Sequence, residues 1–384
     1  MINGFFVRKF RVKIVRLIMK AFWIFPVNNK KIFFSAYEGK HYTCNPRSVY
    51  EQISMLNDYE EYCFIWELNN IEEHKIITDP RVIFVTHNSL KYIFSILTSK
   101  YLITNSGITC YLPLRRQQIN INTWHGGGAY KRVGYGVKSN VSEDLYELSI
   151  VSKQTTYFLS SSKIFTEVMK DSCKIPEKNF LSIGMPRNDV FFDSKKMDSL
   201  KRKVLSYFGF TGQEYLVLYA PTYRGIVGKD ETVDICFDIS KLKKVIEEKF
   251  CRKAIIMVRM HYFNSKNINS KEVISASKYP DMQELLVTVN MLITDYSSSM
   301  WDFALTNKPC ILYTPDLDMY DLERGFYTRP EFWPGILCKS EDKMYQAIYE
   351  YREKEYNAHI SKYLEKSGNY ESGTAISQVL KLIK

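Results

Sequence analysis

Three segments of this 384-residue chain place residue types suited to phosphate chemistry directly after apolar runs. The first, 292–299, reads LITDYSSS and leads into MWDFALTNK, which predicts a helix after a buried strand. Backbone N–H groups at the start of a helix point outward, so hydroxyls beside them can form an anion site. Asp295 and the serines are also ordinary turn and N-cap residues, and the segment taken alone favours a purely structural role.

The second segment, 258–261, reads VRMH and places Arg259 and His261 on one face of an extended chain. A guanidinium group binds phosphate oxygens in a bidentate manner, and an imidazole can donate to a leaving phosphate. The pair therefore suits a pyrophosphate. The alternative is an arginine ion pair beside a buried structural histidine.

The third segment, 124–128, reads WHGGG and joins His125 to three glycines that permit close backbone approach to a ligand. A single histidine at this place also fits a structural role. The HGGG string occurs in the oxyanion loop of esterases, but those enzymes need a G-x-S-x-G nucleophile turn, which is missing from the sequence. The hydrolase interpretation therefore lacks its nucleophile.

The positive charge is concentrated at the N-terminus. The net charge is +11, yet the first 31 residues hold eight basic and no acidic side chains, and the remainder holds 45 basic and 42 acidic ones. A body with a balance of only +3 argues against nucleic-acid binding. The hydrophobic content of 45% is enough for two packed cores.

A helix over residues 5–25 would place its apolar side chains on one face beside a basic stripe. That pattern indicates a helix lying on an anionic membrane surface, with docking onto the protein itself as the alternative. Charges interrupt every apolar run well below the ~20 residues of a membrane span, and no signal-peptide cleavage site follows. The predicted membrane-binding residues are Arg8, Lys9, Lys13, Arg16, Lys20, Phe22 and Trp23.

Two series of short apolar runs alternate with helix-like stretches, which predicts two parallel sheets covered by helices. The runs are 31–36, 63–68, 82–87, 101–106 and 121–125, then 215–221, 254–261, 291–297 and 309–314. We expect an α/β protein with two Rossmann-like domains facing a central cleft. The expected divisions are the basic helix at 1–28, an N-terminal domain at 29–190 and a C-terminal domain at 191–384. Ligands bind beyond the carboxyl ends of such strands, where the three segments above lie.

The eight cysteines form no CxxC pair, and most lie within apolar runs. They indicate reduced core residues of a cytoplasmic protein. The acidic triplet DLD at 316–318 is similar to the metal-binding DxD of some glycosyltransferases, but a solvated loop accounts for it as well. No metal site is assigned and no cofactor is required, while dependence on a divalent metal is left open.

Five motifs together resemble the CDP-glycerol glycerophosphotransferase family, whose members prime and extend teichoic acids. They are WHGGGAYKRVG (124–134), IGMPRND (183–189), LYAPTYRG (218–225), VRMH (258–261) and the stretch from LITDYSSS to RGFY (292–327). The resemblance covers roughly residues 100 to 380 and keeps the order and spacing of the family. It implies a GT-B-like fold, with the nucleotide donor held mainly by the C-terminal domain and the acceptor on the N-terminal side.

The resemblance also implies roles for residues. It places the two catalytic histidines at His125 and His261. Residues matched to donor binding are Arg259, Asp295, Ser297, Ser298, Thr222 and Arg224, with Gly126 and Gly127 beside them. Because a carboxylate is a poor partner for phosphate, Asp295 is expected to cap the turn or to orient Arg259 or a serine hydroxyl.

Two departures from the family pattern affect the loops that could read the substrate. Gly127 and Gly128 stand where the family commonly has Thr-Pro, and Arg329 stands near a frequent Asp. Transfer of substrate identity by resemblance is weakest at these loops.

The resulting hypothesis is transfer of glycerol phosphate from CDP-glycerol to a hydroxyl of a lipid-linked glycan or polyol-phosphate acceptor, with release of CMP. The setting would be teichoic acid or capsule synthesis by a peripheral protein on the cytoplasmic face of the cell membrane. Use of CDP-ribitol is the first alternative. A nucleotide-sugar glycosyltransferase and a non-catalytic, membrane-associated nucleotide-binding protein are further alternatives.

Overall fold

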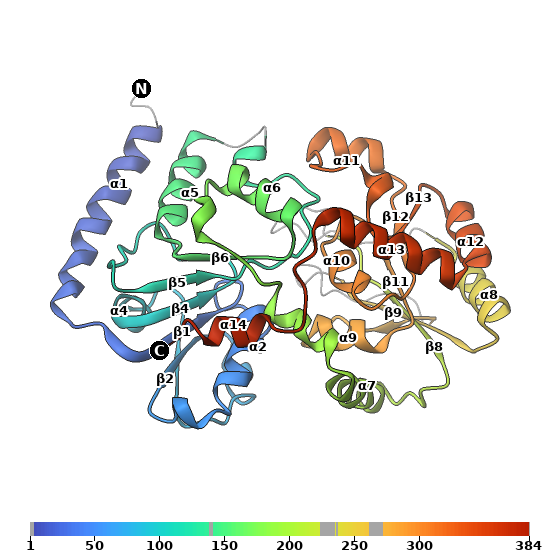
Figure 1. The fold of residues 1–384 in the computed structure, drawn as a ribbon, viewed down its shortest axis with the longest axis horizontal. Helices are drawn as coiled ribbons and strands as arrows, with labels where there is room; N and C mark the ends of the chain where they lie inside the picture. Colours follow the sequence, from blue (N-terminus) through green and yellow to red (C-terminus); the bar gives the residue numbers. More distant parts are fainter. Residues whose placement is uncertain (1–3, 138–140, 223–234, 236, 261–271, 384) are drawn as a thin grey trace. The chain divides into compact units, whose positions relative to one another are not determined.

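The computed structural model divides by its internal contacts into two compact units (Figure 1). The first unit comprises residues 1–125, 132–189 and 370–384, and the second comprises 126–131 and 190–369. The chain thus leaves the first unit after His125, and its last 15 residues return to that unit. The structure describes residues 4–137, 141–222, 235, 237–260 and 272–383.

The first unit is built on a parallel sheet of seven strands in the order β3-β2-β1-β4-β5-β6-β7. Its strands are β1 (Asn28–Ser35), β2 (Cys63–Glu67), β3 (Val82–Val85), β4 (Ser99–Thr104), β5 (Ile119–Asn122), β6 (Tyr157–Ser160) and β7 (Phe180–Ser182). Its described helices are α1 (Gly4–Met19), α2 (Cys44–Ile53), α3 (Ile71–His74), α4 (Leu90–Thr98), α5 (Ser142–Gln154), α6 (Lys163–Cys173) and α14 (Ala375–Leu380). The order reverses direction between β1 and β4, which is where a doubly wound sheet binds its ligand.

The second unit repeats this plan with six parallel strands in the order β10-β9-β8-β11-β12-β13. Its strands are β8 (Tyr215–Tyr219), β9 (Ala254–Val258), β10 (Ile274–Ser275), β11 (Met291–Thr294), β12 (Cys310–Tyr313) and β13 (Ile336–Cys338). Its described helices are α7 (Ser194–Phe208), α8 (Ile239–Phe250), α9 (Met282–Thr288), α10 (Ser299–Ala304), α11 (Leu317–Glu323), α12 (Glu341–Glu350) and α13 (Glu353–Ser367). Here the order reverses between β8 and β11.

Both sheets bury both of their faces, which explains why their strands are apolar without alternation. In β1, Phe33 joins the cluster formed with α4, whereas the next residue, Phe34, stacks on Trp66 and meets Tyr50 of α2. In the second sheet, Leu216 and Val217 likewise belong to two separate core clusters. The predicted α/β class with two parallel sheets is confirmed.

The N-terminal helix is shorter than the sequence predicted and lies beside α5 (Figure 1). It ends at Met19 and continues as a 3₁₀ turn over Lys20–Ile24. Its docking face buries Val12 and bonds Arg8 to Glu147 and Arg16 to the carbonyl of Cys110. Its outer face leaves five apolar side chains 40–69% exposed: Phe6, Phe10, Ile14, Leu17 and Ile18.

Candidate functional site

The imidazole of His125 is held by the backbone that follows a neighbouring strand. His125 Nδ1 lies 2.9 Å from the carbonyl oxygen of Asn105, directly after β4. A carbonyl only accepts hydrogen bonds, so Nδ1 must carry a proton and Nε2 is the basic nitrogen of the neutral ring. The ring also stacks on Trp124, with centroids 4.6 Å apart. This fixes the tautomer that a general base at Nε2 requires.

Hydrogen bonds hold the backbone of the two residues before His125. Trp124 has a left-handed backbone, with φ of 54°, which is uncommon for a bulky residue. Its amide donates to Asn122 Oδ1 at 3.0 Å, and its carbonyl accepts from Asn45 Nδ2 at 3.0 Å. Thr123 bonds through its amide to the carbonyl of Thr104. These bonds hold an unfavourable backbone conformation directly before the histidine.

The IGMPRND motif (183–189), to which the sequence assigns no role, also supports the turn that carries His125. Arg187 is 9% exposed and donates from Nη1 to the carbonyl of His125 at 3.0 Å. Asn188 donates to Glu371 at 3.1 Å, and Asp189 accepts from the amides of Ala375 and Ile376. The motif therefore joins the His125 turn to the returning C-terminal segment.

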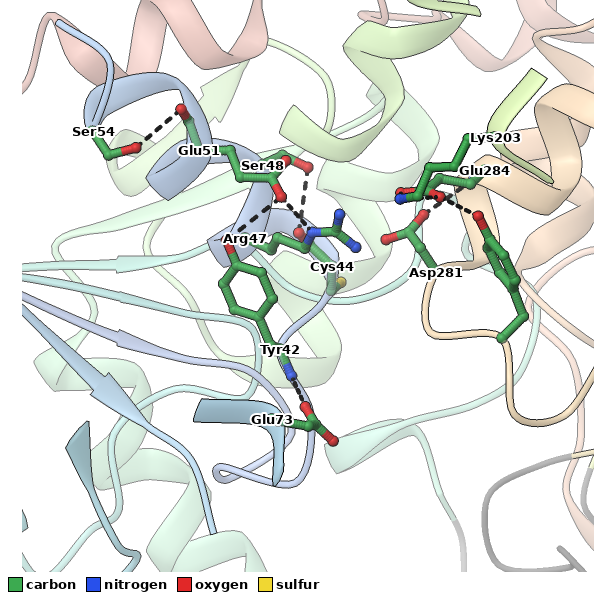
Figure 2. A network of polar contacts seen from close by, with 11 residues as sticks. Tyr42, Cys44, Arg47, Ser48, Glu51, Ser54, Glu73, Lys203, Asp281 and Glu284 are labelled. Atoms are coloured by element: carbon green, nitrogen blue, oxygen red, sulfur yellow. Dashed lines mark hydrogen bonds and ion pairs between the residues drawn. The ribbon is translucent and has the colours of Figure 1, made fainter. Parts of the chain in front are cut away.

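Polar contacts lie before and within α2, the helix that carries Asn45 (Figure 2). Within α2, Arg47 Nε donates to Glu51 at 2.7 Å, and before the helix the amide of Tyr42 donates to Glu73 at 2.6 Å. The pKa of Glu73 is lowered because its hydrogen bonds from His41 and Tyr42 outweigh its burial, which would raise it. The Glu73 contact therefore holds the loop before α2, and the Arg47–Glu51 pair stabilises the helix itself.

In the second unit, Asp295 joins the ends of β11 and β8. The carboxylate is 1% exposed and accepts the backbone amide of Thr222 at 2.8 Å and that of Tyr296 at 2.6 Å. The hydroxyl of Thr222 also donates to it. These bonds show that Asp295 caps the turn at the point where the strand order reverses, which is one of the two roles expected from the sequence.

The serines and glycines of two motifs meet at the start of α10. Ser297 Oγ lies 3.0 Å from Ser299 Oγ, and Ser298 is the N-cap without a capping side-chain bond. A Cβ on Gly126 would lie 2.8 Å from Ser298 Oγ, and one on Gly127 would lie 2.0 Å from the Trp301 ring. The glycines therefore permit close packing on this turn. Helix α10 itself ends at Ala304, earlier than the sequence predicted.

Arg259 is anchored beyond the end of β9. Its Nη1 donates to the carbonyl oxygens of Ala276, at 3.1 Å, and of Tyr279. The hydroxyl of Tyr279 donates to Glu284, which also pairs with Lys203 at 2.8 Å. Figure 2 shows Glu284 beside Lys203. Nη1 of the guanidinium thus has a structural role. Binding of donor phosphate by Arg259 stays a prediction.

The other predicted site residues divide into two groups. His261 and Arg224 lie outside the described residues. Of the predicted membrane contacts, Arg8 and Arg16 bond the protein itself and Phe22 packs against its core. Lys9 lies over the rings of Phe5 and Tyr146, and Lys20 lies over Trp23. Lys13 is exposed on the same helix.

Two further observations bear on ligands. Arg329 lines a cavity of about 400 Å³ beyond β12 and β13, together with Lys339, Asp318 and Asp321. Among the described residues, no group of three or more His, Cys, Asp or Glu side chains could hold a metal ion. Within the same part of the chain, no helix is long and apolar enough to span a membrane.

Comparison with known proteins gives one family and several relatives. Residues 17–384 match the model of the CDP-Glycerol:Poly(glycerophosphate) glycerophosphotransferase family. The teichoic acid poly(glycerol phosphate) polymerase of Bacillus spizizenii is 29% identical, over 97% of this chain and 96% of the relative. The teichoic acid poly(ribitol-phosphate) polymerase of the same species is 27% identical over 92% of this chain, which spans about half of that relative, 55%.

A solved structure confirms the predicted GT-B-like fold with two Rossmann-like domains. It is a variant of the wall teichoic acid polymerase TagF soaked with CDPG, similar with a TM-score of 0.82 and 23% identity. The similarity covers 99% of this chain and 97% of that one. At this identity the likeness establishes the fold.

Proposed function

Because the chain belongs to the CDP-glycerol:poly(glycerophosphate) glycerophosphotransferase family, we propose that it transfers glycerol phosphate from CDP-glycerol to a hydroxyl of a membrane-linked acceptor. The acceptor is a lipid-linked glycan or polyol phosphate, and the products are a phosphodiester and CMP. The relative soaked with CDPG supports a cytidine donor.

In the proposed step, the acceptor oxygen attacks the β-phosphorus of CDP-glycerol. A P–O bond to the glycerol phosphate forms, the bond from that phosphorus to the CMP oxygen breaks, and the hydroxyl proton passes to His125 Nε2. The observation that carries this assignment is the 2.9 Å contact between His125 Nδ1 and the carbonyl of Asn105, which leaves Nε2 as the basic nitrogen. No change of oxidation state occurs.

The donor side of the proposal rests on the second unit. Ser297, Ser298 and the amides behind them are proposed to contact the pyrophosphate, with Arg259 and His261 as charge partners. Asp295 is proposed to hold the turn, since its carboxylate accepts two backbone amides, and Thr222 is proposed to lie beside the donor. Arg224, Gly126 and Gly127 complete the proposed donor region.

CDP-ribitol is a second candidate donor, because a glycerol phosphate and a ribitol phosphate polymerase are nearly equally similar to the chain, at 29% and 27% identity. The deciding experiment measures CMP release from CDP-glycerol and CDP-ribitol, with UDP-sugars as controls, each with and without a lipid-linked disaccharide. We expect acceptor-dependent CMP release from one CDP-polyol. Release from neither donor would overturn the transferase proposal, and binding without turnover would favour a non-catalytic nucleotide-binding protein.

We also propose that α1 holds the protein peripherally on an anionic membrane, at its cytoplasmic face. The helix has one face docked on α5 and an outer face that exposes Phe6, Phe10 and Leu17 by 62–69%. Exposed apolar side chains beside lysines are the pattern of an interfacial helix.

The membrane proposal is tested by flotation of the full chain with phosphatidylglycerol vesicles. The double substitution Phe10→Glu with Leu17→Glu should abolish binding, because it puts charge on the inserting face and leaves the docking contacts of Arg8 and Arg16 intact. The control is Leu322→Glu, a side chain that is 89% exposed on α11. Unchanged flotation of the double variant would contradict the proposal, as would unchanged binding after deletion of residues 1–25.

A further inference from the structure

A small cavity lies at the point where the strand order of the first sheet reverses. It measures about 180 Å³ and is reached by the last residues of three strands: Ser35 of β1, Glu67 of β2 and Thr104 of β4. Ligands of doubly wound sheets bind at this place. The volume is below the ~300 Å³ at which sites for drug-sized ligands begin, so it suits a fragment much smaller than a nucleotide.

The cavity contains a buried carboxylate that is only half satisfied. Glu67 is 2% exposed, and its Oε1 lies 2.5 Å from Nδ1 of His87. This hydrogen bond raises the pKa of His87 above its ordinary value. Among the described residues, the other carboxylate oxygen, Oε2, makes no hydrogen bond. Because Glu67 lines the cavity, this oxygen can accept a hydrogen bond from a ligand hydroxyl or from water.

The chemistry of the cavity wall favours hydroxyl groups over phosphate. Hydroxyl side chains of Ser35, Ser106 and Thr109 line it, together with two further carboxylates, Glu38 and Glu147. The described lining residues include no lysine or arginine, and the imidazole of His87, which also lines the cavity, is bonded to Glu67. Carboxylates accept hydrogen bonds from hydroxyls, whereas they repel a phosphate. The wall therefore fits a neutral polyhydroxylated group.

The N-terminal helix forms two hydrogen bonds to the same cavity wall. Arg8 of α1 donates to Glu147 at 2.6 Å, and Arg16 donates to the carbonyl of Cys110 at 2.6 Å. Both Glu147 and Cys110 line the cavity. Helix α1 lies beside α5, which carries Glu147 (Figure 1). The helix with the exposed apolar face is thus bonded to the cavity wall by its other face.

The cavity also borders the segment that holds His125. Thr104 lines it, and the next residue, Asn105, accepts the Nδ1 hydrogen of His125 through its carbonyl. Thr104 Oγ1 accepts the amide of Gly107, another lining residue, at 3.1 Å. One short backbone turn therefore forms part of the cavity and positions the proposed base.

We propose that this cavity is the acceptor subsite and binds the polyhydroxylated end group of the lipid-linked acceptor, a sugar or a polyol, at the membrane surface. The proposal rests on the proposed transferase function and adds to it the place where the acceptor is held. Glu67 and the hydroxyls of the wall bind the end group, and the turn after β4 brings one of its hydroxyls toward His125.

The first test is binding, which does not depend on turnover. The full chain is floated with phosphatidylglycerol vesicles that contain or lack a lipid-linked disaccharide, without any CDP-polyol. The wild type should bind the disaccharide-containing vesicles about tenfold more tightly at low protein concentration. Val151→Phe, which fills the cavity from α5, should lose this difference and keep the binding to plain vesicles.

The control is Ile76→Phe, since Ile76 is 54% exposed and is not a lining residue. It should behave as the wild type. A second variant, Thr109→Val, removes one lining hydroxyl with almost no change of volume and should weaken the difference about threefold. The subsite would be overturned if the wild type bound both vesicle types equally. It would also be overturned if Val151→Phe still bound the disaccharide-containing vesicles as much more tightly than plain vesicles as the wild type does.

Steady-state rates separate this proposal from the function on which it rests. Val151→Phe should raise the KM for the lipid-linked disaccharide about tenfold and leave the KM for CDP-glycerol within twofold. An unchanged acceptor KM in an active enzyme would overturn the subsite and leave the transferase function standing. A wild type that releases CMP from no CDP-polyol would instead overturn the function, whatever the vesicles show.

Discussion

The two sheets share one strand order but differ at the point where that order reverses. In the first unit, a half-satisfied carboxylate, Glu67, lines a cavity there, and a backbone carbonyl fixes the proton position of His125. In the second unit, Asp295 closes the corresponding point by accepting amides from both adjoining strands. The same topology thus places a cavity and the proposed base at one reversal point and a buried capping carboxylate at the other.

The largest effect on stability is expected at the turn that Asp295 caps. Asp295→Ala leaves the amides of Thr222 and Tyr296 buried without their acceptor, which should lower the free energy of unfolding by about 3 kcal/mol. Urea unfolding measures this, with Asp318→Ala, whose carboxylate is exposed, as a control expected to change little. A loss below about 1 kcal/mol would show that the turn is not held by this residue.

A smaller effect concerns Lys308, which donates to the carbonyls of Val287 and Val289 in the second unit. Burial lowers its pKa from 10.5 to about 8. Between these values the unfolded chain binds more protons than the folded one, so stability should rise with pH, by about 2 kcal/mol. Lys308→Met should remove the rise between pH 8 and 10 in urea unfolding, and a rise retained in that variant would assign it elsewhere.

The smallest effect is expected at the first sheet and has the opposite sign. The hydrogen bond to Glu67 raises the pKa of His87, and the charge of Glu38 raises it further. Burial of the ring and the charge of Lys40 act to lower this pKa. The contribution is complete below the unfolded pKa of about 6.5 and is lost as the pH rises through the folded value. Stability should therefore fall above pH 6.5 by less than about 1 kcal/mol. An equal fall in His87→Gln would contradict this assignment.

The sequence predicts the fold well because both sheets are buried on two faces. Continuous apolar runs such as CFIWEL and PCILYT identify β2 and β12 without any tertiary information. The short strands β6, β7, β10 and β13 were missed, because runs of two to four residues give no periodic signal. The return of residues 370–384 to the first unit depends on Asp189 and Glu371, whose partners are remote in sequence.

The sequence predicts candidate site residues at strand ends but not the residues that hold them. His125 and Asp295 follow apolar runs, so the rule for strand ends identifies both. Asn45, Asn105 and Arg187 hold the His125 turn through bonds to backbone atoms, and such bonds need no distinctive residue pattern. Glu67 and His87 also lie at strand ends, and the same rule applied to every strand would have found them.

The most direct test of the account is the single-turnover rate of His125→Ala with prebound CDP-glycerol and a lipid-linked acceptor. Transfer by the variant should be about 10³-fold slower than in the wild type, because the general base is lost. Binding of CDP-glycerol should be unchanged, and the control His359→Ala, whose side chain is exposed on α13, should keep the wild-type rate. Transfer by His125→Ala within tenfold of the wild type would contradict the account.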